Sequence, residues 1–110
     1  MDKQDIILRQ YREIKSALND KLILQGYAPV HELANDEVFG SRYMIWSNNM
    51  EAMRLTWDGK EQWFILEITE DLPLHALSRW DEIVVTPFNP GRHTAADGNA
   101  ITDDFIKNLE

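Results

Sequence analysis

Three short apolar runs, separated by two polar turns, occupy residues 42–68 and constrain the fold more than any other feature of the chain. The runs cover residues 42–46, 51–57 and 62–68, with Asn48-Asn49 at the first turn and Asp58-Gly59 at the second. Asp-Gly between alternating apolar residues favours a tight hairpin, because glycine adopts a positive φ without steric cost. The segment therefore predicts an antiparallel meander.

The flanking segments predict helices and one more strand. An apolar stripe at three- and four-residue spacing predicts a helix over residues 3–25, and it consists of Ile7, Tyr11, Ile14, Leu18 and Leu22. Gly26 suits the left-handed residue that ends a helix. Residues 30–34 fit either a helical turn or an irregular edge strand, 74–79 fit one or two helical turns, and 83–85 fit a short strand. Thr102 is expected to cap a C-terminal helix whose apolar face holds Phe105, Ile106 and Leu109.

Together these elements predict a single α+β domain over residues 1–110. Its N-terminal helix packs on an antiparallel β-meander of three to four strands, and the C-terminal helix closes it. Two-residue turns would place Met44, Met53 and Phe64 in one row, on the apolar face that receives the N-terminal helix. The opposite face would carry Tyr43, Arg54 and Trp63 in one row.

This second face mixes aromatic, aliphatic and charged side chains, which is unusual for a solvated surface. In the expected register Arg54 stacks on the ring of Tyr43 or Trp63, and Glu61 and Glu67 border the row. Trp, Tyr and Arg are enriched at binding hot spots, so these five residues are the predicted protein-binding site. An alternative remains open, in which residues 77–85 or the C-terminal helix cover this face as a second packing layer.

Charge narrows the range of partners. The chain has a net charge of −8, and the last 55 residues carry four basic and eleven acidic groups. We therefore expect no nucleic acid and no anionic membrane surface as partner, whereas a basic protein would be attracted. The chain contains no cysteine, and its start does not resemble a secretory signal, so the expected location is the cytoplasm.

Motifs that would indicate catalysis or cofactor binding are absent from the sequence. His31, His75 and His93 lie in three separate segments without metal-ligand spacing, and they are expected to be surface residues. The sequence contains no phosphate-binding loop, dinucleotide fingerprint or nucleophile elbow. We therefore predict neither an enzyme nor a bound cofactor or metal.

Three segments carry a resemblance to known proteins. They are 39–43 (Phe-Gly-Ser-Arg-Tyr), 54–59 (Arg-Leu-Thr-Trp-Asp-Gly) and 63–67 (Trp-Phe-Ile-Leu-Glu), about thirty residues with the turns between them. This pattern resembles small bacterial α+β proteins of unknown role, and some acidic proteins of that build are similar to immunity proteins that neutralise toxins. The resemblance implies a non-enzymatic role in binding a partner, and it assigns no role to any single residue.

The leading hypothesis is thus a small, acidic, non-enzymatic module that binds another protein, with an immunity-type role as one form of it. An alternative is a sensor of a small molecule or peptide, with a pocket between helix and sheet lined by Trp57, Phe64 and Met53. A third is a homodimer that hides the aromatic face against its own copy.

Overall fold

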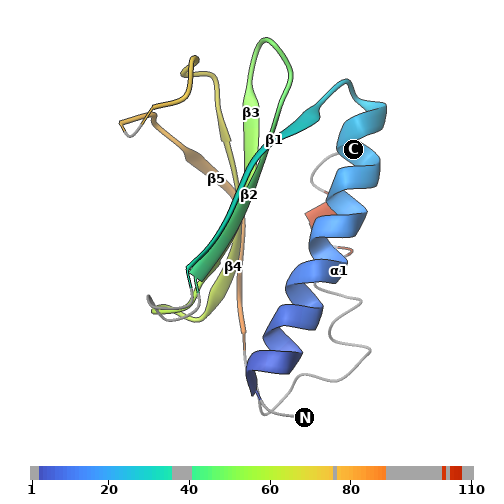
Figure 1. Cartoon of the computed structure of the whole chain (residues 1–110), viewed down its shortest axis with the longest axis vertical. Coiled ribbons are helices and arrows are strands. Elements are labelled where there is room, and N and C mark those ends of the chain that lie inside the picture. The colour runs from blue at the N-terminus through green and yellow to red at the C-terminus, as the bar shows by residue number, and fades with distance from the viewer. Residues whose placement is uncertain (1–2, 36–40, 76, 89–102, 104, 108–110) are drawn as a thin grey trace.

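A computed structural model shows one long helix packed on a five-stranded antiparallel sheet (Figure 1). It describes residues 3–35, 41–75, 77–88, 103 and 105–107. The elements follow the chain as α1 (Lys3–Leu24), β1 (Ala28–Asn35), β2 (Ser41–Ser47), β3 (Ala52–Asp58), β4 (Trp63–Thr69) and β5 (Asp81–Pro87). The strands lie side by side in the order β1-β2-β3-β4-β5. The predicted α+β meander is confirmed, with one strand more than the upper estimate.

The predicted apolar stripe is the buried face of α1. All five of its residues are at most 3% exposed. The helix ends as predicted at Gly26, which has a φ of 92°. The Tyr27 N–H donates to the Leu22 carbonyl at 2.9 Å and the Gly26 N–H donates to the Ile23 carbonyl at 3.1 Å, which is the hydrogen-bond pattern of a Schellman cap.

The predicted strand register is wrong, although the predicted faces are correct. Met44 pairs with Leu55 rather than with Met53, a shift of two residues. Met53 in turn pairs with Ile68 rather than with Phe64, a shift of four. An even shift leaves every side chain on its original face, because strand side chains alternate with a period of two. The apolar and mixed faces therefore carry the predicted residues, but each residue has a different neighbour on the adjacent strand.

The turns explain the shifted register, because both are longer than two residues. Asn48 accepts the Met50 and Glu51 N–H groups on its side-chain oxygen, both at 2.8 Å, and this cap stabilises a four-residue connection. In the second turn, the side-chain oxygen of Asp58 accepts the N–H groups of Lys60 and Glu61, at 3.0 and 3.1 Å. The left-handed residue of this second turn is Gln62, with a φ of 62°, rather than the expected Gly59. An Asx-type cap thus replaces the tight Asp-Gly turn.

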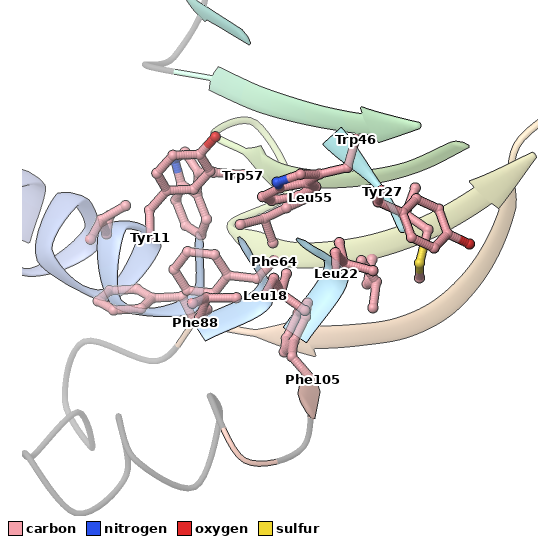
Figure 2. Packing of buried hydrophobic residues seen from close by; sticks show 14 residues of the cluster. Tyr11, Leu18, Leu22, Tyr27, Trp46, Leu55, Trp57, Phe64, Phe88 and Phe105 are labelled. Atoms are coloured by element: carbon pink, nitrogen blue, oxygen red, sulfur yellow. The ribbon is translucent and has the colours of Figure 1, made fainter. Parts of the chain in front are cut away.

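The hydrophobic core fills the space between α1 and the sheet (Figure 2). Trp46, Leu55 and Trp57 are fully buried there. The Trp57 and Phe64 rings lie 4.7 Å apart, and both make edge-on contacts with Phe88. Trp57, Phe64 and Met53, which were expected to line a pocket between helix and sheet, are 0%, 0% and 3% exposed. They form a packed core.

Several segments that the sequence left open are now assigned. Residues 30–34 belong to the edge strand β1, which is irregular between Pro29 and His31. The expected strand at 83–85 is confirmed within β5, at the other edge. Residues 74, 75 and 77–79 are not helical, so the helical turns expected there are wrong. The sequence also suggests that the first strand of the meander begins at residues 37–39, and these lie outside the described residues.

The C-terminal helix is represented by Asp103 and residues 105–107, which are helical. Phe105 is fully buried in the core cluster, and Ile106 packs against the cluster. The predicted cap Thr102 and the predicted apolar residue Leu109 lie outside the described residues. No helix within the described part of the chain is long and apolar enough to cross a lipid bilayer.

Candidate functional site

A part-buried ion pair lies at the centre of the second face, the side of the sheet turned away from α1. Arg54 on β3 and Glu67 on β4 are directly paired in the sheet. The Arg54 Nε and Nη2 atoms donate to the two carboxylate oxygens of Glu67 at 3.0 and 3.1 Å. Glu67 is 9% exposed, and the Thr56 hydroxyl lies 3.4 Å from one of its oxygens. This bidentate geometry fixes the plane of the guanidinium group.

Trp80 covers this ion pair from outside the sheet. The Arg54 Cζ atom lies 4.2 Å from the centre of the Trp80 ring, a cation–π contact. The stacking partners predicted from sequence were Tyr43 and Trp63, and the structure replaces both with Trp80. The alternative in which residues 77–85 cover this face is therefore correct in part. Trp80 covers Arg54, whereas β5 does not cover the face but joins the sheet as its edge strand.

The segment between β4 and β5 positions Trp80, and it lies on the opposite side of the sheet from α1 (Figure 1). Side-chain caps shape this segment. Ser78 Oγ accepts the His75 N–H at 2.9 Å, and His75 Nδ1 accepts the Leu77 N–H at 3.1 Å. The other ring nitrogen, His75 Nε2, lies 3.5 Å from a carboxylate oxygen of Asp71. These contacts orient His75 and Ser78 beside the sheet.

A pocket of about 570 Å³ lies between this segment and the second face. We call it the second-face pocket, and it is lined by His31, Tyr43, Ile45, Arg54, Leu74, His75, Ser78 and Trp80. The His31 and Tyr43 rings lie 5.4 Å apart on one wall. None of the described residues that line the pocket is acidic, although the chain carries 19 aspartate and glutamate side chains. It offers aromatic surface together with imidazole, hydroxyl and guanidinium groups.

The five residues predicted as a binding site separate into two groups. Arg54 and Glu67 form the ion pair, and Tyr43 lines the same pocket two strand positions from Ile45. Trp63 pairs with Asp58 and with Pro87, away from this pocket. Glu61 is exposed in the turn after β3. Trp63 and Glu61 therefore lie neither next to Arg54 nor in the lining of the pocket.

The predicted site residues include only Tyr43 and Arg54 of the eight described residues that line the pocket, so six were missed, among them Ile45 and Leu74. His31 and His75 were interpreted as surface residues of unrelated segments, and Ser78 and Trp80 received no role. Trp80 carried one usable signal, because it is a large aromatic residue in an otherwise polar stretch and such residues are rarely left in solvent. Nothing in the spacing of His31 and His75 indicates that they line one cavity.

Among the residues that the structure describes, no group of three histidine or acidic side chains is arranged to hold a metal ion. Comparison of the chain with protein-family models, with curated proteins and with solved structures finds no match. The second-face pocket therefore has to be interpreted from its own geometry. Its ion pair uses two of the three Arg54 nitrogens, and its aromatic walls favour binding of an apolar or planar group.

Proposed function

We propose that this chain is a non-enzymatic binding module that recognises another protein through the second-face pocket. The observation that carries the proposal is the Arg54 side chain, held by Glu67 below and Trp80 above at the wall of an aromatic cavity. A rigid guanidinium beside Trp and Tyr rings is the composition typical of interface hot spots. Because these side chains are already ordered, binding loses little side-chain entropy.

Charge around the pocket supports a basic partner. The nearby carboxylates of Asp71, Asp81 and Glu82 belong to exposed residues, and Glu82 pairs with Glu67 across β4 and β5. Interfaces commonly combine an apolar or aromatic centre with a charged rim, and rim charges chiefly raise the association rate. An immunity-type role, in which this acidic chain neutralises a basic toxin, is the form of the proposal that agrees with the resemblance described above.

Variants of the pocket and its rim test the proposal. Tyr43→Ala and Trp80→Ala remove aromatic contacts, and Glu82→Lys reverses one rim charge. Glu13→Lys is the matched control, because Glu13 is exposed on α1 and the change in net charge is the same. The tagged chain is used to capture partners from its source cells, and the affinity of the captured protein for each folded variant is then measured.

We expect Tyr43→Ala and Trp80→Ala to weaken binding by about tenfold or more each, since single hot-spot truncations cost more than about 1 kcal/mol. Glu82→Lys is expected to slow association, and Glu13→Lys to leave it unchanged. Equal affinities for all four variants would reject the second-face pocket as the recognition site. A self-associating chain whose dimer is broken by Tyr43→Ala would instead establish the homodimer.

A small-molecule or peptide sensor is the second candidate, and the size of the pocket favours it. A volume of about 570 Å³ lies within the ~300–1,000 Å³ typical of small-ligand sites. Such a ligand stabilises the folded chain by mass action. A metabolite that raises the unfolding temperature of the parent chain, but not that of Trp80→Ala, would support the sensor over the protein-binding module.

A further inference from the structure

A further pocket, of about 420 Å³, lies at the end of the sheet where β2 turns into β3. Its apolar lining consists of Val30 on β1 and residues 72–74 (Leu-Pro-Leu) between β4 and β5. Residues 47–49 of the turn supply its polar side, and we call this the end pocket. In Figure 1 the turn and the segment between β4 and β5 both lie at the upper end of the sheet.

The end pocket adjoins the second-face pocket. Leu74 lines both pockets, and the consecutive β1 residues Val30 and His31 line one pocket each. Strand β1 is an edge of the sheet, and its residues 28–33 are all exposed. A ligand that extends beyond the second-face pocket at this edge can therefore reach the end pocket as well.

The two pockets suit different side chains. The walls of the end pocket are aliphatic, whereas the second-face pocket presents the rings of Tyr43 and Trp80. An aliphatic group therefore suits the end pocket, and a flat aromatic group suits the second-face pocket. In an extended peptide, residues two positions apart point to the same side and lie about 7 Å apart. Two adjoining pockets match such a pair of side chains.

Asn49 supplies hydrogen-bonding groups that suit a peptide backbone. It is exposed and lines the end pocket, and its side-chain amide carries one carbonyl acceptor and two N–H donors. Each peptide unit offers the matching N–H donor and carbonyl acceptor. The neighbouring Asn48 differs, because its side-chain oxygen already caps the turn. The end pocket thus combines apolar walls with a group that can bind main chain.

Charge around the two pockets favours a basic peptide. Residues 70–82 carry four acidic side chains, all exposed, against one exposed arginine, Arg79. Two of the acids, Glu70 and Asp71, directly precede the end-pocket residues 72–74. None of the described residues that line the end pocket is charged, and Arg54 of the second-face pocket is paired with Glu67. A cationic side chain next to the aliphatic one would be attracted to Glu70 and Asp71.

We propose that the two pockets together bind one extended, basic segment of the partner protein. In this segment an aliphatic and an aromatic residue are separated by one residue and are flanked by lysine or arginine. The aliphatic side chain enters the end pocket, the aromatic one enters the second-face pocket, and Asn49 binds the peptide backbone. Recognition of an extended segment by pockets for alternate side chains is a recurring mode of peptide binding. The inference rests on the function proposed above, since it names the part of the partner that is recognised.

A phage-displayed library of random linear heptapeptides tests the proposal, with the full chain as target and an unrelated acidic protein as control. We expect the selected peptides to share the aliphatic and aromatic pair at this spacing and to carry lysine or arginine. Moving the aromatic residue next to the aliphatic one in a synthetic selected peptide should weaken binding by about tenfold, because the two side chains then point to opposite sides. Failure to select peptides, or selection of peptides without this pattern, would overturn the proposal.

Variants of the chain locate the peptide. Val30→Ala should weaken binding of the selected peptide by about fivefold or more, and Leu33→Ala by less than about twofold. Val30 and Leu33 lie on the same strand and are 53% and 45% exposed, but Leu33 lines neither pocket. Glu70→Lys should weaken binding by about threefold or more, whereas Glu13→Lys, at an exposed position of α1, should leave it unchanged. Equal effects within either pair would overturn the assignment.

The captured partner distinguishes failure of this inference from failure of the proposed function. Suppose that Tyr43→Ala and Trp80→Ala lower the affinity for the partner, but Val30→Ala and Glu70→Lys do not. The second-face pocket then remains the recognition site, and the extended segment is overturned. Unchanged affinity in all four variants would reject the proposed function as well. A chain that selects no peptide but forms a dimer broken by Val30→Ala would show that a second copy occupies the pockets, which also overturns the inference.

Discussion

Arg54 and Glu67 face each other across β3 and β4 and are joined by two hydrogen bonds of 3.0 and 3.1 Å beneath the ring of Trp80. The pair connects two interior strands of the sheet, and among the described residues Arg54 is the one arginine or lysine that lines the second-face pocket. Fold stability and the candidate site therefore share the same two side chains. This overlap makes the pair the first target for mutation.

Replacing Glu67 with glutamine should destabilise the fold. The substitution keeps the size of the side chain, but it leaves the Arg54 charge beneath Trp80 without its carboxylate. We expect a loss of about 1–3 kcal/mol in the free energy of unfolding, measured with urea. Glu61→Gln is the matched control, because Glu61 is exposed, and it should change stability by less than about 0.5 kcal/mol. Similar losses in the two variants would show that the ion pair contributes nothing specific.

The contact between α1 and β2 through Asn19 makes a second prediction. The indole N–H of Trp46 donates to the side-chain oxygen of Asn19 at 3.0 Å, and Trp46 is fully buried. Asn19→Ala leaves that N–H unpaired in the core and should cost about 1–3 kcal/mol in chemical unfolding. Alanine also has a higher helix propensity than asparagine, which by itself would stabilise α1. Asp20→Ala measures this effect at the exposed neighbouring position. A stability of Asn19→Ala equal to that of Asp20→Ala would contradict the prediction.

Gly26 makes a prediction about backbone conformation alone. Its φ is 92°, and a Cβ atom added there would meet nothing within 4 Å. Gly26→Ala should therefore lose about 1–2 kcal/mol purely because a side chain disfavours left-handed backbone. Gly26→Asn should lose less, since asparagine tolerates this conformation better. Urea unfolding of the three proteins gives the order of stability, and any order other than Gly, Asn, Ala would refute this explanation.

The raised pKa values of two tyrosines predict that the fold loses stability at alkaline pH. Burial is the main cause of the raised pKa at both Tyr11 and Tyr27, and at Tyr27 the hydrogen bond to Glu51 and the charge of that carboxylate raise it further. A phenol whose folded pKa exceeds its unfolded value stabilises the fold fully below the unfolded pKa, near ~10. That stability is lost as the pH rises from about 10 toward the folded values.

Urea unfolding from about pH 8 to about pH 11 measures this loss. The parent chain should lose stability steadily above about pH 10. The double variant Tyr11→Phe/Tyr27→Phe should lose markedly less over the same range, because it lacks both phenols. Parallel pH profiles for the two proteins would show that other groups cause the alkaline loss.

The candidate site was only partly predictable. The sequence predicted three of the residues at this site, Arg54, Tyr43 and Glu67. Side chains alternate between the two faces of a strand, so an even shift of register leaves these three on the mixed face. Trp63 was placed beside Arg54 because the turns were assumed to contain two residues each. The length of a turn depends on caps such as the Asp58 side chain, and several turn lengths suit the same sequence.

The amino-acid sequence by itself determined the buried stripe of α1, its end at Gly26 and the two faces of the meander, because each depends only on residues close together in the chain. Only the tertiary structure decided that Trp80 covers Arg54, and that Val30 and Leu74 line one pocket with Asn49. These neighbours come from segments without a shared periodicity. Their meeting depends on how the whole sheet pairs and how the segment between β4 and β5 lies against it, which no local pattern encodes.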